Sequence, residues 1–350
     1  MDRMPSPPPR TTSRGPTFSG LAAFSDDGNW RSLTAMRSKY DLYLMETYPR
    51  ESWSSGWEII DSRLVATLQR VAILTIKPDG IVGRKAAACL EFMARNGYVP
   101  LFARRFAYTR HITRELWRYQ WNVASIDRLA VSTLLNSLTD AVMIFFVDDT
   151  KDAQLPASVR LTGLKGSNVP AERSDRHLRC VLGGVNRIIT YVHCADEPID
   201  IVREIGIVFP ADEVEQIYRD IDHALKNGGS PESVETVLSG VHDAHPRRIL
   251  DLDPAIERFE ELAGRPLARS HHVRDALFRA QAAVRGARMS EVPLSWRSWI
   301  ADCRGAGLDP DPWTEFVIGA HLIDGDRPED WCILANGSSD WRQGNGRRVF

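Results

Sequence analysis

Lys77 ends an apolar run, where its ammonium group could meet a phosphate. The run is Val71–Ile76, and Pro78, Asp79 and Gly80 follow it as a turn. This pattern predicts a buried strand that stops at the turn. A lysine at a strand end is a natural partner for phosphate oxygens. A phosphate site at this position needs further cations and a reacting group from elsewhere in the chain.

Candidates for the further cations and for the reacting group occur between residues 157 and 209. His193 follows a short apolar run, and Glu204 lies in the helical pattern after it. A neutral imidazole is a competent nucleophile near pH 7, because its unperturbed pKa is about 6.5. A carboxylate on its far nitrogen would orient the ring and support the charge that forms during attack. The side chains before the histidine that could neutralise phosphate oxygens are Arg160 and Arg179.

Strands and helices are expected to alternate from residue 69 to residue 215. Apolar and β-branched content predicts strands at 71–76, 98–107, 141–147 and 188–192. Helical patterns are found at 86–95, 111–120, 128–138 and 199–209. This order predicts the α+β class, a sandwich with helices on one face of a mostly antiparallel sheet.

Taken in order, these motifs resemble the nucleoside diphosphate kinase family. That family has a strand ending in KPDG, an R-x-x-x-G-x-T-N-P-like loop, an x-[IL]-R segment and an H-G-S-D histidine loop followed by E-x-x-x-W-F. The corresponding stretches here are 77–80, 160–171, 177–179 and 193–209. The resemblance covers roughly residues 70–215. It implies a ferredoxin-like (βαββαβ) antiparallel-sheet sandwich of nucleoside diphosphate kinase type over residues 69–215.

The resemblance also implies a role for each matching residue. His193 falls on the nucleophile that takes the γ-phosphoryl group of a nucleoside triphosphate and passes it to a diphosphate. Glu204 falls on the carboxylate that holds the other ring nitrogen, and Asp196 on the aspartate of the histidine loop. The positions that bind or neutralise phosphates are Lys77, Tyr119, Arg160, Ser167 and Arg179. Mg²⁺ is expected to arrive on the nucleotide, so no metal site of the protein itself is predicted.

The sequence departs from the family pattern near the histidine and near the expected base. The loop reads H-C-A-D, with Cys194 and Ala195 in place of a glycine and a serine, and Thr190 replaces an asparagine. The segment after Tyr119 lacks the R-P-F-F that supplies a phosphate arginine and the aromatic base clamp. Arg128 is a candidate replacement for the arginine, and the aromatic has no clear substitute. These changes leave the phosphate chemistry in place and make the choice of base uncertain.

The regions that flank this domain are predicted to contain helices or disordered chain and no strands. Residues 1–28 are rich in Pro, Ser, Thr and Gly and are expected to be disordered. Residues 29–68 predict two short helices joined by a loop at Trp53–Gly56. Residues 216–350 predict a mostly helical region without a catalytic motif, which is a candidate surface for a protein partner or a homo-oligomer.

The composition of the 350 residues narrows the class of protein. The formal net charge of -2 argues against a general nucleic-acid binder. The five cysteines are widely spaced and form no CxxC pair, which fits reduced thiols in a cytosol. No apolar run approaches the roughly 20 residues of a membrane span, and the N-terminus lacks the apolar middle of a secretory signal. We therefore expect a cytoplasmic protein, and the excess of arginine over lysine fits the codon composition of a GC-rich, bacterial genome.

Three functions fit these observations. The first is a phosphotransferase that works on nucleoside tri- and diphosphates through a phosphohistidine at His193. The second is a catalytically impaired nucleotide-binding or regulatory module whose helical region binds a partner. The third is a specialised kinase for an unusual nucleotide. Phosphohistidine formation separates the first from the second, and a panel of acceptor diphosphates separates the first from the third.

Overall fold

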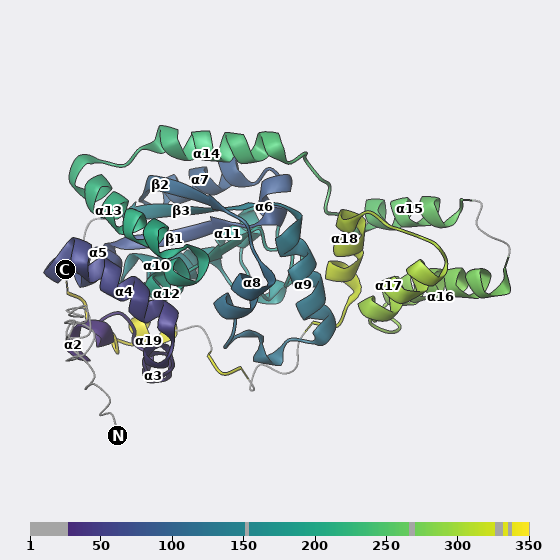
Figure 1. The fold of residues 1–350 in the computed structure, drawn as a ribbon, viewed down its shortest axis with the longest axis horizontal. Helices are drawn as coiled ribbons and strands as arrows, with labels where there is room; N and C mark the ends of the chain where they lie inside the picture. The colour runs from purple at the N-terminus through teal and green to yellow at the C-terminus, as the bar shows by residue number, and fades with distance from the viewer. Residues whose placement is uncertain (1–26, 151–153, 266–269, 326–331, 335–337, 350) are drawn as a thin grey trace, which may run out of the picture.

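The computed structural model describes residues 27–150, 154–265, 270–325, 332–334 and 338–349 (Figure 1). The segment 1–28, predicted to be disordered, lies outside these ranges except for its last two residues. Those two residues begin the first described helix, α2 (Asp27–Arg31).

A four-stranded antiparallel sheet lies at the centre of the fold, with the strand order β2-β3-β1-β4. Its strands are β1 (Val71–Ile76), β2 (Tyr98–Phe106), β3 (Ala141–Asp148) and β4 (Val192–Cys194). Neighbouring residues of a strand point to opposite faces. In β1, Ala72, Leu74 and Ile76 therefore enter one core, and Val71 and Ile73 enter another. The α+β class and the antiparallel sheet are confirmed.

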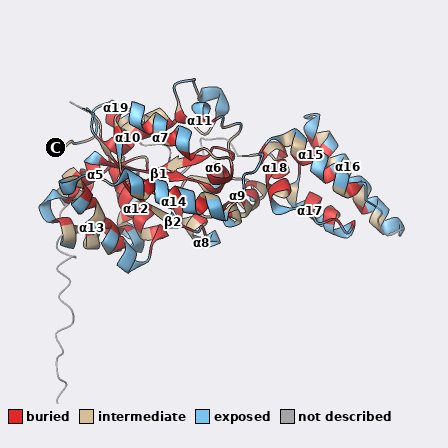
Figure 2. Ribbon diagram, turned by 90° about the horizontal axis from the view of Figure 1, so that it is seen from above, coloured by how far each residue is buried: buried red, intermediate tan, exposed pale blue. Residues whose placement is uncertain are grey.

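Helices cover both faces of this sheet, whereas the sequence predicts them on one face only (Figure 1). On one face pack α7 (Ala86–Arg95), α9 (Ile126–Leu138), α10 (Ala157–Lys165) and α14 (Pro231–Ala244). On the other face pack α3 (Arg37–Met45), α4 (Thr47–Ile60), α5 (Leu64–Arg70), α12 (Pro198–Val208) and α13 (Ala211–Asn227). The second layer combines α3, α4 and α5, which precede β1, with α12 and α13, which follow β4. Buried residues accordingly lie on both sides of β1 (Figure 2).

Short elements connect these layers. They are η1 (Asp61–Arg63), α6 (Pro78–Val82), α8 (Arg110–Leu116), η2 (Trp121–Val123), η3 (Pro170–Glu172), α11 (Leu178–Val181) and α19 (Ser338–Arg342). Among the residues that the structure describes, no helix has the length and apolar character needed to cross a membrane.

The loop predicted at Trp53–Gly56 is wrong, because α4 continues through it. Gly56 lies under the ring of Tyr218 in α13, and an added Cβ would stand 2.9 Å from two ring carbons. The glycine therefore allows α4 and α13 to pack closely and does not end the helix.

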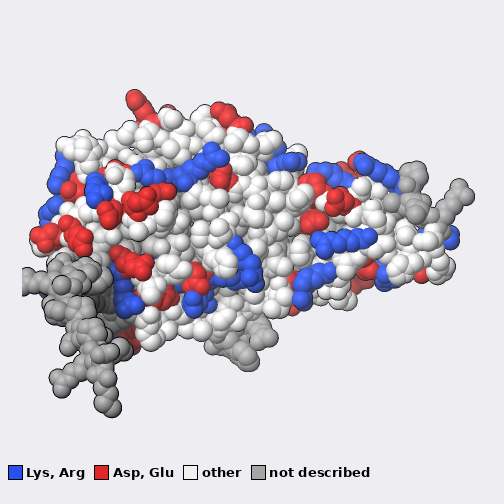
Figure 3. All heavy atoms as spheres, in the orientation of Figure 1, with Lys and Arg blue, Asp and Glu red and all other residues white. Residues whose placement is uncertain are grey.

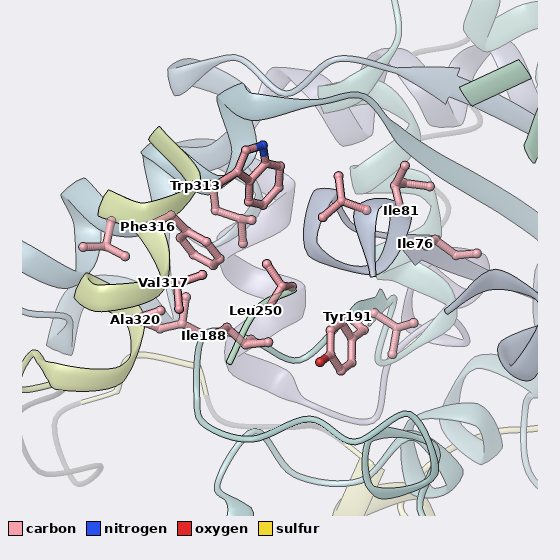
Figure 4. Close-up of a cluster of buried hydrophobic side chains, with 14 of the residues drawn as sticks. Ile76, Ile81, Ile188, Tyr191, Leu250, Trp313, Phe316, Val317 and Ala320 are labelled. Carbon is pink, nitrogen blue, oxygen red and sulfur yellow. The ribbon is translucent and has the colours of Figure 1, made fainter. Parts of the chain in front are cut away.

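The C-terminal region is helical, with α15 (Leu252–Ala263), α16 (His271–Arg288), α17 (Trp296–Gly305) and α18 (Pro312–Leu322). The predicted boundary at 215/216 falls inside α13. Helices α15, α16 and α17 extend away from the sheet (Figure 1). Helix α18 instead faces the main body through Trp313, Phe316 and Val317, which meet Leu250 and Ile188 in one apolar cluster (Figure 4).

The strand predicted at 188–192 is also wrong, because β4 begins only at Val192. Side chains take the backbone N–H groups that a strand would use. Asn186 Oδ1 accepts from Ile188 and Ile189, and Asp79 Oδ2 accepts from the next two residues. His193 therefore lies within β4, paired opposite Thr75, and not after a strand.

The glycine of the Lys77–Gly80 turn is predicted to be required for stability. A Cβ on Gly80 would stand 2.6 Å from the backbone oxygen of Tyr191. Gly80→Ala should therefore lower the free energy of unfolding by about 1–3 kcal/mol, measured by urea denaturation. The control is Gly240→Ala in α14, where nothing lies within 4 Å of an added Cβ. That change should leave stability unchanged or raise it by up to about 1 kcal/mol, and an equal effect of both changes would contradict the packing argument.

Candidate active site

A cavity of about 650 Å³ opens beside β4. Its walls come from the α8–η2 segment, α9, α10 with the loop after it, β4 and α12. The sequence-predicted residues that line it are Lys77, Ser167, Arg179, His193, Asp196 and Glu204. Tyr119 and Arg160 are not among the lining residues.

His193 and Glu204 form a hydrogen-bonded pair in this cavity. The ring Nε2 lies 2.8 Å from Glu204 Oε1, and the two side chains are 16% and 8% exposed. A carboxylate at Nε2 favours the tautomer that carries its proton there, which leaves a lone pair on Nδ1. The pair meets because Glu204 lies within α12, which begins four residues after β4 ends. The imidazole is therefore held by one nitrogen and can react through the other.

Lys77 and Arg179 are buried cations in the same wall. Lys77 Nζ donates to the carbonyl of Ile188 at 3.0 Å and lies 3.5 Å from Asp79. Arg179 donates to the carbonyls of Gly166 and Val192. Burial lowers the pKa of Lys77 and lowers the pKa of Arg179 to about 10. Burial thus disfavours the charged form of both side chains, and an anion in the cavity would stabilise that form.

Lys165 is a cation of this site that the sequence reasoning missed. Its Nζ lies 3.2 Å from Asp196 Oδ1, and the Thr162 hydroxyl donates to the same oxygen at 3.1 Å. The Cys194 thiol lies 3.3 Å from Thr162 Oγ1 and is buried, and burial raises its pKa. The histidine loop is therefore fixed to α10 by an ion pair and a hydroxyl. The signal in the sequence was a lysine five residues after Arg160, at the end of the same helix.

Arg160 and Tyr119, predicted to bind phosphates, make other contacts and do not line the cavity. The Arg160 guanidinium makes two hydrogen bonds of 2.6 Å to Asp148 and lies over the ring of Tyr98. The Tyr119 ring stacks on Tyr43 at 6.0 Å. Ser167 does line the cavity, but its hydroxyl donates to Glu172 at 2.5 Å within its own loop.

Two tryptophans form an aromatic wall beside the histidine. Trp117 and Trp121 stack with centroids 4.7 Å apart, and Trp117 meets the His193 ring edge-on at 5.3 Å. No substitute for the aromatic base clamp was predicted from the sequence. The signal that could have revealed one is the spacing of four residues, which puts two side chains on the same face of a helical turn.

Further polar side chains from distant parts of the chain complete the lining. They include Gln120, Arg128, Asn136, His177, Arg187 and Arg342. Arg128, predicted as the replacement for a phosphate arginine, is buried and lies over the ring of Trp121 at 6.0 Å. Within the described ranges, no group of three His, Cys, Asp or Glu side chains is placed to hold a metal ion.

Among the comparisons with known proteins, only the comparison with solved structures gives matches. No family model and no curated protein matches this chain. The nucleoside diphosphate kinase of Aquifex aeolicus, solved in an orthorhombic crystal form, is 16% identical over 40% of this chain and 95% of its own, with a TM-score of 0.34. The apo enzyme of Encephalitozoon cuniculi is 17% identical over 40% of this chain and 92% of its own, with a TM-score of 0.34. At these TM-scores the two matches carry no argument about the fold or the activity of this chain.

The ion pair of the histidine loop predicts a pH-dependent stability. Burial raises the pKa of Asp196, but Lys165, Lys39 and His193 outweigh it and bring the pKa to about 2. Because this lies below the unfolded value of about 3.9, the carboxylate adds stability above about pH 4 that is lost toward pH 2. Asp196→Asn should therefore cost about 2 kcal/mol near pH 7 and progressively less below about pH 4, by urea denaturation.

The matched control is Asp175→Asn, which changes an exposed carboxylate of the preceding loop. It should show no such pH-dependent difference from the wild type. A cost of Asp196→Asn that stays constant between about pH 7 and pH 3 would contradict the assigned ion pair.

Proposed function

We propose that this protein is a nucleoside diphosphate kinase-like phosphotransferase that works through a phosphohistidine at His193. It moves the γ-phosphoryl group of a nucleoside triphosphate to a nucleoside diphosphate or a related nucleotide. The observation that carries the proposal is the His193–Glu204 pair in a cavity that also holds Lys77 and Arg179. The strand order β2-β3-β1-β4, with helices between strands, supports a ferredoxin-like sandwich for residues 69–215.

The first half-reaction uses the free nitrogen of the ring. The Nδ1 lone pair attacks the γ-phosphorus, the bond from that phosphorus to the bridging oxygen breaks, and the diphosphate leaves with the bonding electrons. The ring becomes positively charged, and Glu204 on Nε2 stabilises that charge. Phosphoryl transfer requires mainly positioning and charge neutralisation, which the lysine and arginine side chains of the wall supply.

The second half-reaction runs the same chemistry in reverse. A terminal oxygen of the acceptor diphosphate attacks the phosphorus, and the phosphorus–nitrogen bond breaks to return the lone pair to Nδ1. Mg²⁺ belongs to the nucleotide substrate, where it neutralises phosphate oxygens. No group of the protein is assigned to hold it.

Labelling with [γ-³²P]ATP tests the nucleophile. Wild type should acquire an acid-labile, base-stable label, and His193→Ala should acquire none. Glu204→Gln should still be labelled, but more slowly by roughly ten- to a hundred-fold, because a charge-assisted hydrogen bond contributes about 1.5–3 kcal/mol.

The matched control is His223→Ala, which removes an exposed histidine of α13. It should label like the wild type. Undiminished labelling of His193→Ala would sink the proposal, and nucleotide binding without labelling of the wild type would favour the regulatory module.

The tryptophan wall is proposed to bind the base by stacking. Trp121→Ala should weaken binding of adenine, guanine and cytosine triphosphates alike, because stacking contributes about 1–3 kcal/mol with any base. Trp121→Phe should retain most of the affinity. Isothermal titration with the three nucleotides measures this, and affinities unchanged by Trp121→Ala would place the base elsewhere.

A further inference from the structure

The C-terminal tail reaches the candidate active site from more than 120 residues beyond α12. Three of its described residues line the cavity, namely Cys332, Leu334 and Arg342. The tail also contacts the segment between α8 and η2, since the Leu334 N–H donates to the carbonyl of Tyr119 at 3.3 Å. The cavity wall is therefore completed by residues outside the domain that carries His193.

Trp341 anchors the tail directly beside Arg342. Its indole is 4% exposed, and Nε1 donates to Glu197 Oε1 at 2.7 Å. Glu197 is fully buried at the start of α12 and also pairs with Lys39 at 2.7 Å. The backbone next to Arg342 is thus fixed to the helix that supplies Glu204.

The Arg342 guanidinium lies on Gly163 of α10. A Cβ added to Gly163 would stand 2.0 Å from Arg342 Nη2 and 3.3 Å from Cζ. The arginine therefore occupies the space that any side chain at this helix position would need. Gly163 lies next to Thr162 and two residues before Lys165, the two partners of Asp196 in the cavity wall.

Unlike the neighbouring cations, Arg342 has no carboxylate partner among the described residues. Lys165 is paired with Asp196, and Arg203 is paired with Glu46. Among the described residues, Arg342 has no hydrogen bond or ion pair. An exposed arginine at the rim of a cavity, on an anchored backbone, is available to an anionic ligand, and a guanidinium matches phosphate oxygens in geometry and charge.

We propose that Arg342 binds a phosphate group of the nucleotide, so that the C-terminal tail supplies a substrate-binding residue. This inference rests on the proposed function, because it takes the ligand of the cavity to be a nucleotide. It also assigns Gly163 a role, which is to leave room for the arginine.

Binding of ATP to the full chain, measured by isothermal titration, tests the inference. Arg342→Ala should weaken binding roughly ten-fold or more, as expected for the loss of a charge-assisted contact. Arg347→Ala, which removes an exposed arginine of the same tail that does not line the cavity, should bind like the wild type.

Gly163→Ala provides a second test that does not alter a charge. Alanine favours a helix interior more than glycine, so this variant should remain at least as thermally stable while displacing Arg342. It should weaken ATP binding, and the double variant with Arg342→Ala should bind no worse than Arg342→Ala alone.

The outcomes separate this inference from the proposed function. If the wild type binds ATP and Arg342→Ala binds it equally well, Arg342 is an ordinary surface arginine. The proposed phosphotransferase function would be unaffected by that result. A loss in Gly163→Ala that adds fully to the loss in Arg342→Ala would also overturn the inference. Wild type that binds no ATP would overturn both.

Discussion

The buried carboxylate of Asp79 is the interaction on which the site depends. Its Oδ2 accepts hydrogen bonds from the N–H groups of Thr190 at 3.1 Å and Tyr191 at 2.8 Å, directly before β4. Lys77 adds two bonds to the same segment, from its N–H to the carbonyl of Tyr191 and from Nζ to the carbonyl of Ile188. Bonds to a charged group are stronger than neutral ones. The turn after β1 therefore holds His193 in place as well as placing a lysine in the cavity.

Both flanking regions hold the helix that carries Glu204. Lys39 of α3 is 1% exposed and lies between Glu197 and Asp200 at 2.7 and 2.8 Å, while Trp341 of the tail donates to Glu197. Breaking such a buried pair would leave an uncompensated charge. On the face drawn in Figure 3, basic and acidic side chains are interspersed, whereas Lys39, Glu197 and Asp200 are buried inside the fold. The extensions are thus part of the site's framework.

Local patterns in the sequence predicted the elements whose formation depends on local residues. The apolar runs of β1 and β3 and the helix 86–95 were found because strand and helix periodicities are readable within one segment. The segment before β4 was misassigned because its N–H groups bond to Asp79, 111 residues away. Arg160 was predicted to bind phosphate and Arg342 was not named, for a similar reason. Arg160 pairs with Asp148 and Arg342 lies on Gly163, and neither contact leaves a trace in the local sequence.

The central claim is that His193 accepts a phosphoryl group because its other nitrogen is held by Glu204. The most direct measurement is peptide mapping by mass spectrometry, under alkaline conditions, after brief incubation of the full chain with ATP and Mg²⁺. The account predicts one phosphoryl group on the peptide that contains His193, and its loss when an acceptor diphosphate is added. A phosphoryl group on another residue, or an unmodified peptide despite bound ATP, would contradict it.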